Sequence, residues 1–158
     1  MVFAKTKTAA AALSEQIQNH EFEKCYQAVV CGALPDEFGT FEDMLLRDGK
    51  TNTTLVVPEG TKGAKRAELD YEMIDQIETR DGVLSWVLII LHTGRHHQIR
   101  VQLASRNMPV AGDGKYGGNM AVQAAERIKG IRIKRGCIAL CAVSLKVDGK
   151  LYEVKPGF

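Results

Sequence analysis

The residue types best suited to chemistry gather in residues 91–107, LHTGRHHQIRVQLASRN. Two arginines and two histidines fall within six positions of this segment, namely Arg95, His96, His97 and Arg100. Arginine binds carboxylates and phosphates at two points, and histidine exchanges protons near neutral pH. The segment therefore predicts an anion site, with a metal site or an acid–base site as alternatives.

Metal binding is the less favoured of these interpretations. His92 and His96 are four positions apart, as in metal-binding helices, but Gly94 and a predicted strand-to-helix turn separate them. The H-E-x-x-H pattern is absent. The cysteines form no C-x-x-C pair and are expected to be buried, reduced thiols; they are Cys25, Cys31, Cys137 and Cys141. We expect no metal.

Two other common kinds of site lack their sequence patterns. No G-x-S-x-G elbow marks a nucleophilic serine, and the cysteines lie in strand-like runs. The glycine-rich AGDGKYGG does not fit the phosphate-binding G-x-x-x-x-G-K-[ST] pattern. An anion site at a helix start remains the better prediction.

This anion site depends on a helix expected at residues 96–106. Thr93 could cap the helix, whose first turn carries free N–H groups and partial positive charge. Side-chain donors would come from Arg95, His97 and Arg100. Ile99 and Leu103 share one face and would seat the helix in a core, while His96 shares the opposite face with Arg100. The alternative is a polar face that is merely solvated.

Charge is distributed unevenly along the chain. Residues 1–94 carry nine basic and fifteen acidic residues, whereas residues 95–135 carry nine basic and two acidic ones. A basic region of this kind fits a polyanion such as nucleic acid better than a small acid. The alternative is a solvated helix face beside a basic loop.

The elements that must position these residues predict an α+β fold: a mixed, mainly antiparallel sheet with a few flanking helices, in a single domain spanning residues 1–158. Alternation is clearest at residues 66–73, whereas residues 83–91 do not alternate and should be buried on both faces. Other strands are expected at residues 24–31, 40–47, 53–57, 137–147 and 150–155. Helices are expected at residues 8–20, 96–106 and 121–128.

The N-terminus predicts an incomplete sheet. Residues 1–4 look like the end of a strand, and an exposed apolar edge there would invite self-association. MVFAKTKTAAAAL is too short and polar for a signal peptide, and no apolar run approaches the ~20 residues of a membrane span. A cytoplasmic protein without membrane partners is therefore expected.

Several segments resemble RluA-type RNA pseudouridine synthases. HTGRHHQIRVQLASRNMPVAGDGKYGG resembles the family signature T-G-R-x-H-Q-[IL]-R-V-H-L…P-[IV]-x-G-D-x-x-Y-G. EKCYQAVVCG resembles the strand E-K-x-Y-x-A-x-V-x-G, and CIALCAVSLKV resembles the L-H-A-x-x-L strand. MVFAKTK resembles the segment that follows H-R-L-D-x-x-T-S-G. The resemblance covers essentially the whole chain.

The resemblance implies an enzyme that isomerises uridine in ribosomal or transfer RNA without a cofactor. It implies that Arg100 pairs with a nucleophilic aspartate and that Tyr26 packs under the target base; a tyrosine in an alternating strand is otherwise more often a core residue. Signature positions that hold RNA or the architecture of the site are Arg95, His97 and Gln98. Basic residues expected to bind structured RNA are Lys129, Arg132, Lys134 and Arg135.

The chain departs from the family pattern in one consequential way. The aspartate-bearing motif is absent, and Asp113 belongs instead to the later G-D-x-x-Y-G segment. The chain is thus expected to be the C-terminal part of a catalytic domain and inactive alone, with the carboxylate partner of Arg100 outside it. The alternative is a non-catalytic RNA-binding module from a split or decayed gene. Smaller departures are Gln102 and Cys141, where histidine is usual.

Overall fold

The computed structural model describes residues 4–18, 22–127, 133–134, 136–147 and 149–158. Its helices are α1 (Lys7–Gln18), α2 (Gln98–Ala104) and α3 (Gly118–Arg127). Its strands are β1 (Glu23–Cys31), β2 (Phe38–Asp48), β3 (Thr53–Val57), β4 (Lys65–Thr79), β5 (Gly82–Leu91), β6 (Leu140–Val147) and β7 (Lys150–Glu153). Each predicted strand that falls within these ranges is confirmed, most with shifted ends.

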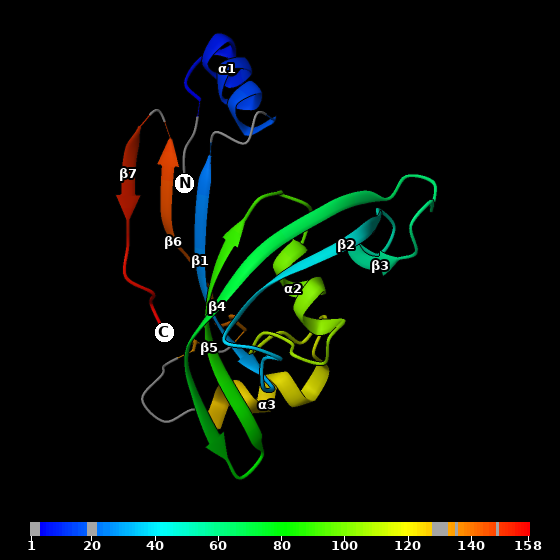
Figure 1. Cartoon of the computed structure of the whole chain (residues 1–158), viewed down its shortest axis with the longest axis vertical. Helices are drawn as coiled ribbons and strands as arrows, with labels where there is room; N and C mark the ends of the chain where they lie inside the picture. Colours follow the sequence, from blue (N-terminus) through cyan, green and yellow to red (C-terminus); the bar gives the residue numbers. More distant parts are fainter. Residues whose placement is uncertain (1–3, 19–21, 128–132, 135, 148) are drawn as a thin grey trace.

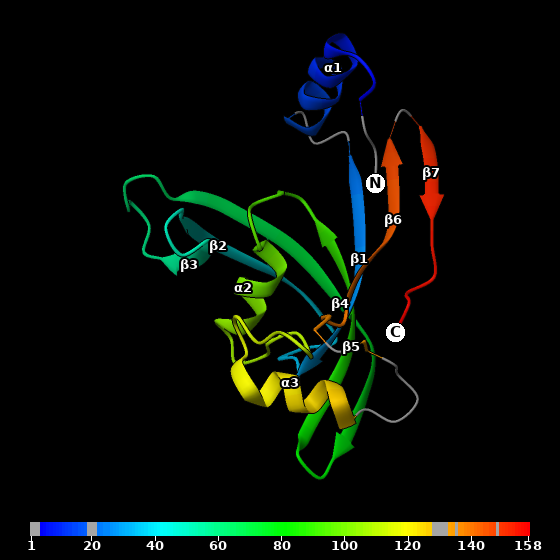
Figure 2. The same ribbon diagram turned by 180° about the vertical axis from the view of Figure 1, so that it is seen from behind.

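The described strands form one sheet in the order β3-β2-β4-β5-β1-β6-β7. All neighbouring pairs are antiparallel, which confirms the predicted α+β class. The sheet is strongly twisted, so that β2 and β4 run obliquely to β1 and β6 (Figure 1). The hairpin formed by β4 and β5 turns at the end of the molecule opposite α1 (Figures 1 and 2).

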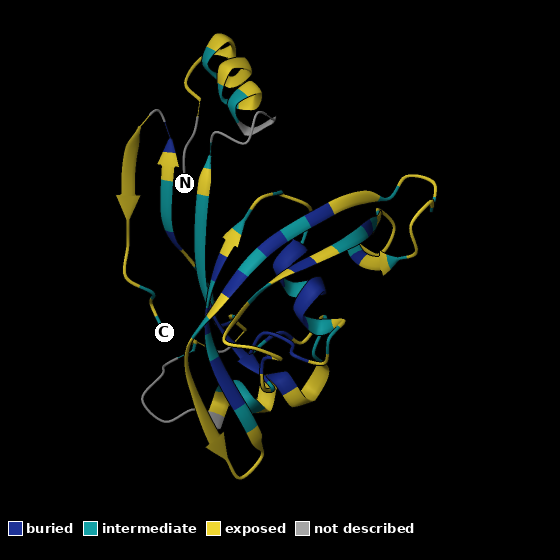
Figure 3. Ribbon diagram, viewed as in Figure 1, coloured by how far each residue is buried: buried dark blue, intermediate teal, exposed yellow. Residues whose placement is uncertain are grey.

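The core lies where α2 and the segment after it pack against the middle of the sheet. Ile99 and Leu103 are buried there with Leu69, Val87 and Ile89, which confirms the predicted apolar face of the helix. In Figure 3 the buried residues concentrate on this part of the fold, whereas β7 and the tips of the hairpins are exposed. The core thus anchors α2, which carries Arg100.

The prediction that residues 83–91 are buried on both faces was wrong. Val87 and Ile89 are fully buried, but Leu88 and Trp86 are only half-buried and Ile90 is 38% exposed. The face that carries Ile90 is thus only partly covered within the described residues. Strand β5 is apolar on both faces, but only one face is buried along its length.

Helix α1 confirms the predicted N-terminal helix and stands beyond the end of β1, apart from α2 and α3 (Figures 1 and 2). The strand expected at residues 1–4 falls mostly on residues 1–3, which lie outside the described residues. In the described sheet the edges are β3 and β7, while β1 lies between β5 and β6. Self-association through an N-terminal edge therefore stays a prediction. Among the described helices, none has the length and apolar character needed to cross a membrane.

Candidate active site

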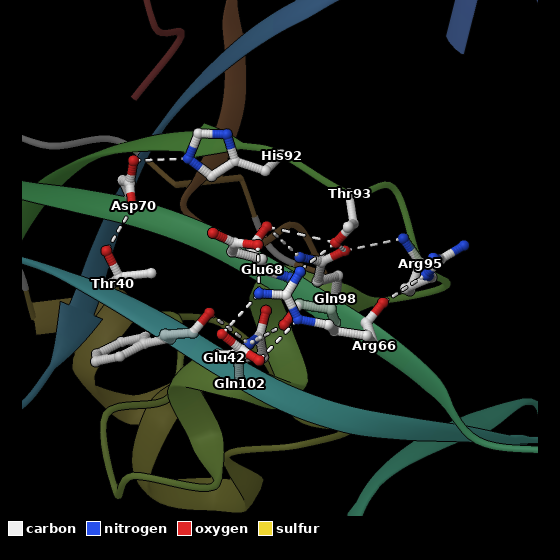
Figure 4. Close-up of polar contacts among 12 residues, drawn as sticks. Thr40, Glu42, Arg66, Glu68, Asp70, His92, Thr93, Arg95, Gln98 and Gln102 are labelled. Atoms are coloured by element: carbon white, nitrogen blue, oxygen red, sulfur yellow. Dashed lines mark hydrogen bonds and ion pairs between the residues drawn. The ribbon is translucent and has the colours of Figure 1, made fainter. Parts of the chain in front are cut away.

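A buried glutamine fixes the turn between β5 and α2. Gln98 is 2% exposed, and its Oε1 accepts hydrogen bonds from Thr93 Oγ1 (2.8 Å) and the Arg95 backbone N–H (2.9 Å). Its Nε2 donates to the Glu68 carbonyl of β4 at 3.0 Å (Figure 4). Both the oxygen and the nitrogen of this amide are hydrogen-bonded within the chain, so Gln98 holds the turn in place, and its expected contact with RNA stays a prediction.

The predicted cap of the helix at Thr93 was wrong. Helix α2 begins at Gln98, and its N-cap residue is His97, which has φ 52° and makes no side-chain cap. The Thr93 hydroxyl instead accepts a hydrogen bond from the Glu68 backbone N–H at 2.8 Å. The side chain therefore ties the turn to β4, and the predicted anion site at a Thr93-capped helix start does not form.

Arg100 has a carboxylate partner inside the chain. Its Nε and Nη2 donate to the two oxygens of Asp113, each at 2.7 Å. The Asp113 side chain is 1% exposed, and Oδ1 also accepts hydrogen bonds from the backbone N–H groups of Lys115 and Tyr116. This arginine therefore already holds one carboxylate inside the chain, and its expected pairing with an aspartate outside the chain stays a prediction.

The ion pair changes the ionisation of both partners. The hydrogen bond to Asp113 raises the pKa of Arg100, so the guanidinium stays charged. Burial alone would raise the pKa of the Asp113 carboxyl. The hydrogen bonds from Arg100 and from the Tyr116 backbone N–H outweigh burial and hold that pKa below its ordinary value. Asp113 is thus an ionised structural carboxylate.

Tyr116 connects α2 to β3. Its hydroxyl accepts a hydrogen bond from the Thr54 backbone N–H and is bonded to His97 Nδ1, both at 2.9 Å. The ring lies under the guanidinium of Arg100, with the Arg100 Cζ 5.0 Å from the ring centroid. Arg100 is therefore held by an anion on one side and an aromatic ring on another.

His97 is uncharged at neutral pH. Burial lowers its pKa to about 4, and the nearby charge of Arg100 adds to this shift. The rings of His96 and His97 are also in contact, with centroids 3.8 Å apart and planes tilted by 31°. His97 is thus not a cation at pH 7, and its expected contact with RNA stays a prediction.

The histidines and cysteines of the described residues do not come together as metal ligands. His96 Nδ1 bonds to Thr54 Oγ1 at 2.9 Å, while His92 Nε2 bonds to Asp70 Oδ2 at 2.6 Å. Within the described ranges, no three His, Cys, Asp or Glu residues lie close enough together to hold a metal ion. Only Cys31 is buried among the four free thiols, and Cys137 is exposed, so the prediction of buried cysteines was wrong for the others.

Tyr26 lies on β1, opposite Ile89 of β5. Its ring packs against the core cluster that also contains Ile99 and Leu103 of α2. Burial raises the pKa of its hydroxyl. The structure places Tyr26 and α2 against one core but gives no direct contact between Tyr26 and Arg100.

Of the five predicted RNA-binding lysines and arginines, two lie within the described residues and three lie outside them. Arg95 is exposed next to the turn, and its Nε donates to the Arg66 carbonyl at 2.9 Å (Figure 4). Lys134 is exposed in the segment before β6. The other three predicted residues, Lys129, Arg132 and Arg135, lie outside the described residues. Their contribution to RNA binding stays a prediction.

Sequence reasoning missed the roles of Asp113, Tyr116 and Thr54. The first two stand in the G-D-x-x-Y-G part of the quoted signature, which could have marked them as partners of the arginine. Thr54 carries no such signal, because its contact with Tyr116 joins residues 62 positions apart.

Comparisons with known proteins identify the family. Residues 1–105 match the family model described as RNA pseudouridylate synthase. An uncharacterized RNA pseudouridine synthase of Chlorobaculum parvum is 37% identical over 120 residues, which are 75% of this chain and 35% of that protein. The ribosomal large subunit pseudouridine synthase D of Buchnera aphidicola is 32% identical over 135 residues, covering 82% of this chain and 40% of that protein.

The solved structures agree with the sequence comparisons. The human RNA pseudouridylate synthase domain containing 1 superposes with a TM-score of 0.70 and 26% identity, over 96% of this chain and 60% of that one. Fold, signature and relatives define an RNA-modifying isomerase class. The chain belongs to the RNA pseudouridylate synthase family, and it spans about a third of the length of the curated relatives it matches.

Proposed function

We propose that this chain is the C-terminal part of the catalytic domain of a pseudouridine synthase that acts on ribosomal or transfer RNA. The reaction breaks the N1–C1′ bond of a uridine, forms a C5–C1′ bond and moves the proton from C5 to solvent while N1 is protonated. It needs no oxidant or reductant. In this proposal Tyr26 meets the base once it has left its stack, and Arg100 holds the nucleophilic carboxylate.

The geometry of Arg100 is the observation that supports this proposal best. Asp113 takes the Nε and Nη2 donors, and no described residue accepts a hydrogen bond from Nη1. The side chain of Arg100 remains 19% exposed. A second carboxylate could therefore bind Nη1 while Asp113 keeps the guanidinium oriented.

Asp113 itself is poorly suited to be the nucleophile. Both of its oxygens accept from Arg100, Oδ1 accepts two backbone N–H groups as well, and the side chain is buried. A nucleophile needs a free lone pair that can reach its substrate. We therefore propose that the chain alone binds RNA without isomerising uridine. The occupied carboxylate of Asp113 is equally compatible with the alternative, a non-catalytic RNA-binding module. A cytoplasmic location stays a prediction.

A single assay tests whether the chain alone binds RNA and whether it is inactive. The chain is incubated with ribosomal and transfer RNA carrying tritium at C5 of uridine, and both RNA binding and tritium release are measured. We expect salt-sensitive binding without release. Release from the chain alone would contradict its inactivity, whereas absence of binding would contradict an RNA-binding role.

The catalytic role of Arg100 is tested in a longer chain that includes H-R-L-D-x-x-T-S-G, if the coding sequence upstream of Met1 carries that motif. Arg100→Met should abolish tritium release while RNA affinity stays within about tenfold. Wild-type rates in this variant would refute the role. An upstream sequence without the motif would favour the non-catalytic module.

A further inference from the structure

Lys24 lies two positions before Tyr26 on β1. Side chains alternate along a strand, so both residues project from the same face of the sheet. Tyr26 is paired with Ile89, which is fully buried in the core that also holds α2. Lys24 therefore lies beside the proposed catalytic tyrosine on the same face, two residues nearer the start of β1.

The ammonium group of Lys24 reaches the turn that begins the functional segment. Its Nζ lies 3.5 Å from the position that a Cβ would occupy on Gly94. The same Nζ is 5.8 Å from the centroid of the Phe22 ring. The head group is thus placed between β1 and the turn that carries Arg95.

Lys24 is partly buried without a described counter-charge. The ion pairs among the described residues leave it out, and its neighbour Glu23 is paired with Lys146 at 2.7 Å. Burial lowers the pKa of the Lys24 ammonium, and no nearby carboxylate opposes this effect. A partly buried cation that lacks an anion gains from binding one, because the anion offsets the loss of hydration.

We propose that Lys24 binds a backbone phosphate of the RNA strand whose uridine meets Tyr26. Lysine recognises phosphate as a point charge, and phosphate contacts fix the register of a nucleic acid rather than its sequence. Lys24 is then a positioning residue that holds the strand at the Gly94 turn. This inference rests on the proposed function, since it needs RNA at Tyr26.

The test uses the whole chain and a fluorescently labelled RNA hairpin with uridines in its loop. Kd is measured by anisotropy between about 50 and 200 mM KCl. Lys24→Met should lower the magnitude of the log–log salt slope by about 0.7 to 0.9, the value of one phosphate contact. Lys24→Arg should restore most of the slope, and Lys150→Met, an exposed residue on β7, should leave it unchanged.

The possible results separate the phosphate contact of Lys24 from RNA binding by the chain as a whole. A wild-type slope in Lys24→Met would overturn the phosphate contact and leave RNA binding intact. Absence of salt-dependent binding by the wild-type chain would overturn the proposed function as well. If Lys24→Met fails to fold, as judged by circular dichroism, Lys24→Gln removes the charge while keeping a polar head, and the same slope decides the question.

Discussion

Asp113 accepts hydrogen bonds from Nε and Nη2 of Arg100 and takes none from Nη1. The Tyr116 ring beneath the guanidinium limits its rotation. Asp113 is in turn fixed by two backbone N–H groups of its own loop. Arg100 is therefore preorganised by its own chain before any other carboxylate binds.

Removing the charge of Asp113 should destabilise the fold. Asp113→Asn leaves the guanidinium of Arg100 without its anion, although an amide oxygen can still accept the loop N–H groups. Breaking a buried pair costs about 3–5 kcal/mol, and partial exposure of Arg100 reduces this, so we expect a loss of about 2 kcal/mol in the free energy of urea unfolding. Asp75→Asn, an exposed control, should change it by less than about 0.5 kcal/mol.

The pH dependence gives a second check on Asp113. A carboxyl whose pKa is lowered on folding stabilises the protein above its ordinary pKa of 3.8, and this contribution disappears as pH falls through the lower folded value. The stability gap between the wild type and Asp113→Asn should be full at pH 7 and shrink below about pH 4. A gap that persists unchanged at pH 3 would contradict an ionised Asp113.

His97 should make stability depend on pH in a higher window. Its pKa is about 4 in the folded chain because of burial and the charge of Arg100, against an ordinary 6.5. The unfolded chain binds the proton more readily, so this residue costs stability as pH falls from about 6.5 to about 4. Asn tolerates the left-handed backbone at this position (φ 52°) and does not titrate.

The variant His97→Asn should therefore lose less stability than the wild type between pH 6.5 and 4, as measured by urea unfolding at several pH values. An NMR titration of the His97 ring should give its pKa directly. Equal slopes in both proteins would show that His97 titrates normally in the folded chain.

The sheet was accessible to sequence reasoning because its signals are local. The alternation at residues 66–73, for example, depends only on neighbouring residues. Burial of β5 was overestimated, because exposure of Ile90 depends on what covers that face and not on the strand itself. Local pattern therefore predicted the elements better than their surroundings.

The contacts of the candidate site were less accessible because they are non-local or depend on backbone geometry. Thr93 has the residue type of a helix cap, but its hydroxyl accepts a hydrogen bond from the Glu68 backbone N–H of the neighbouring strand β4. The sequence indicated that Arg100 pairs with a carboxylate, but its partner Asp113 lies in a loop whose folding back cannot be read from spacing. An arginine in a sequence therefore indicates that a carboxylate or phosphate partner is needed, but it does not identify the partner residue.

Gln102 stands where the resembled signature has histidine, and it is fully buried. Its Nε2 donates to Asp43 Oδ2 at 2.8 Å and to the Phe41 carbonyl at 3.2 Å, but Oε1 has no hydrogen-bond partner among the described residues. An unsatisfied buried acceptor costs about 1–3 kcal/mol.

Gln102→His can keep a donor to Asp43 without the unpaired carbonyl, so we expect about 1 kcal/mol more stability in urea unfolding. Gln102→Leu removes the donor as well and should be less stable than Gln102→His. The reverse order of the two variants would show that the amide oxygen of Gln102 is satisfied in solution.

The basic segment before β6 should supply most of the salt dependence of RNA binding. Alanine is introduced together at Lys129, Arg132, Lys134 and Arg135. If each binds one phosphate, the log–log salt slope should fall by up to about four units of contact, since every contact releases a counterion. The matched control replaces four exposed lysines elsewhere, namely Lys50, Lys62, Lys150 and Lys155. Both variants lose the same net charge, so an equal fall in slope would mean that general charge, and not this segment, attracts the RNA.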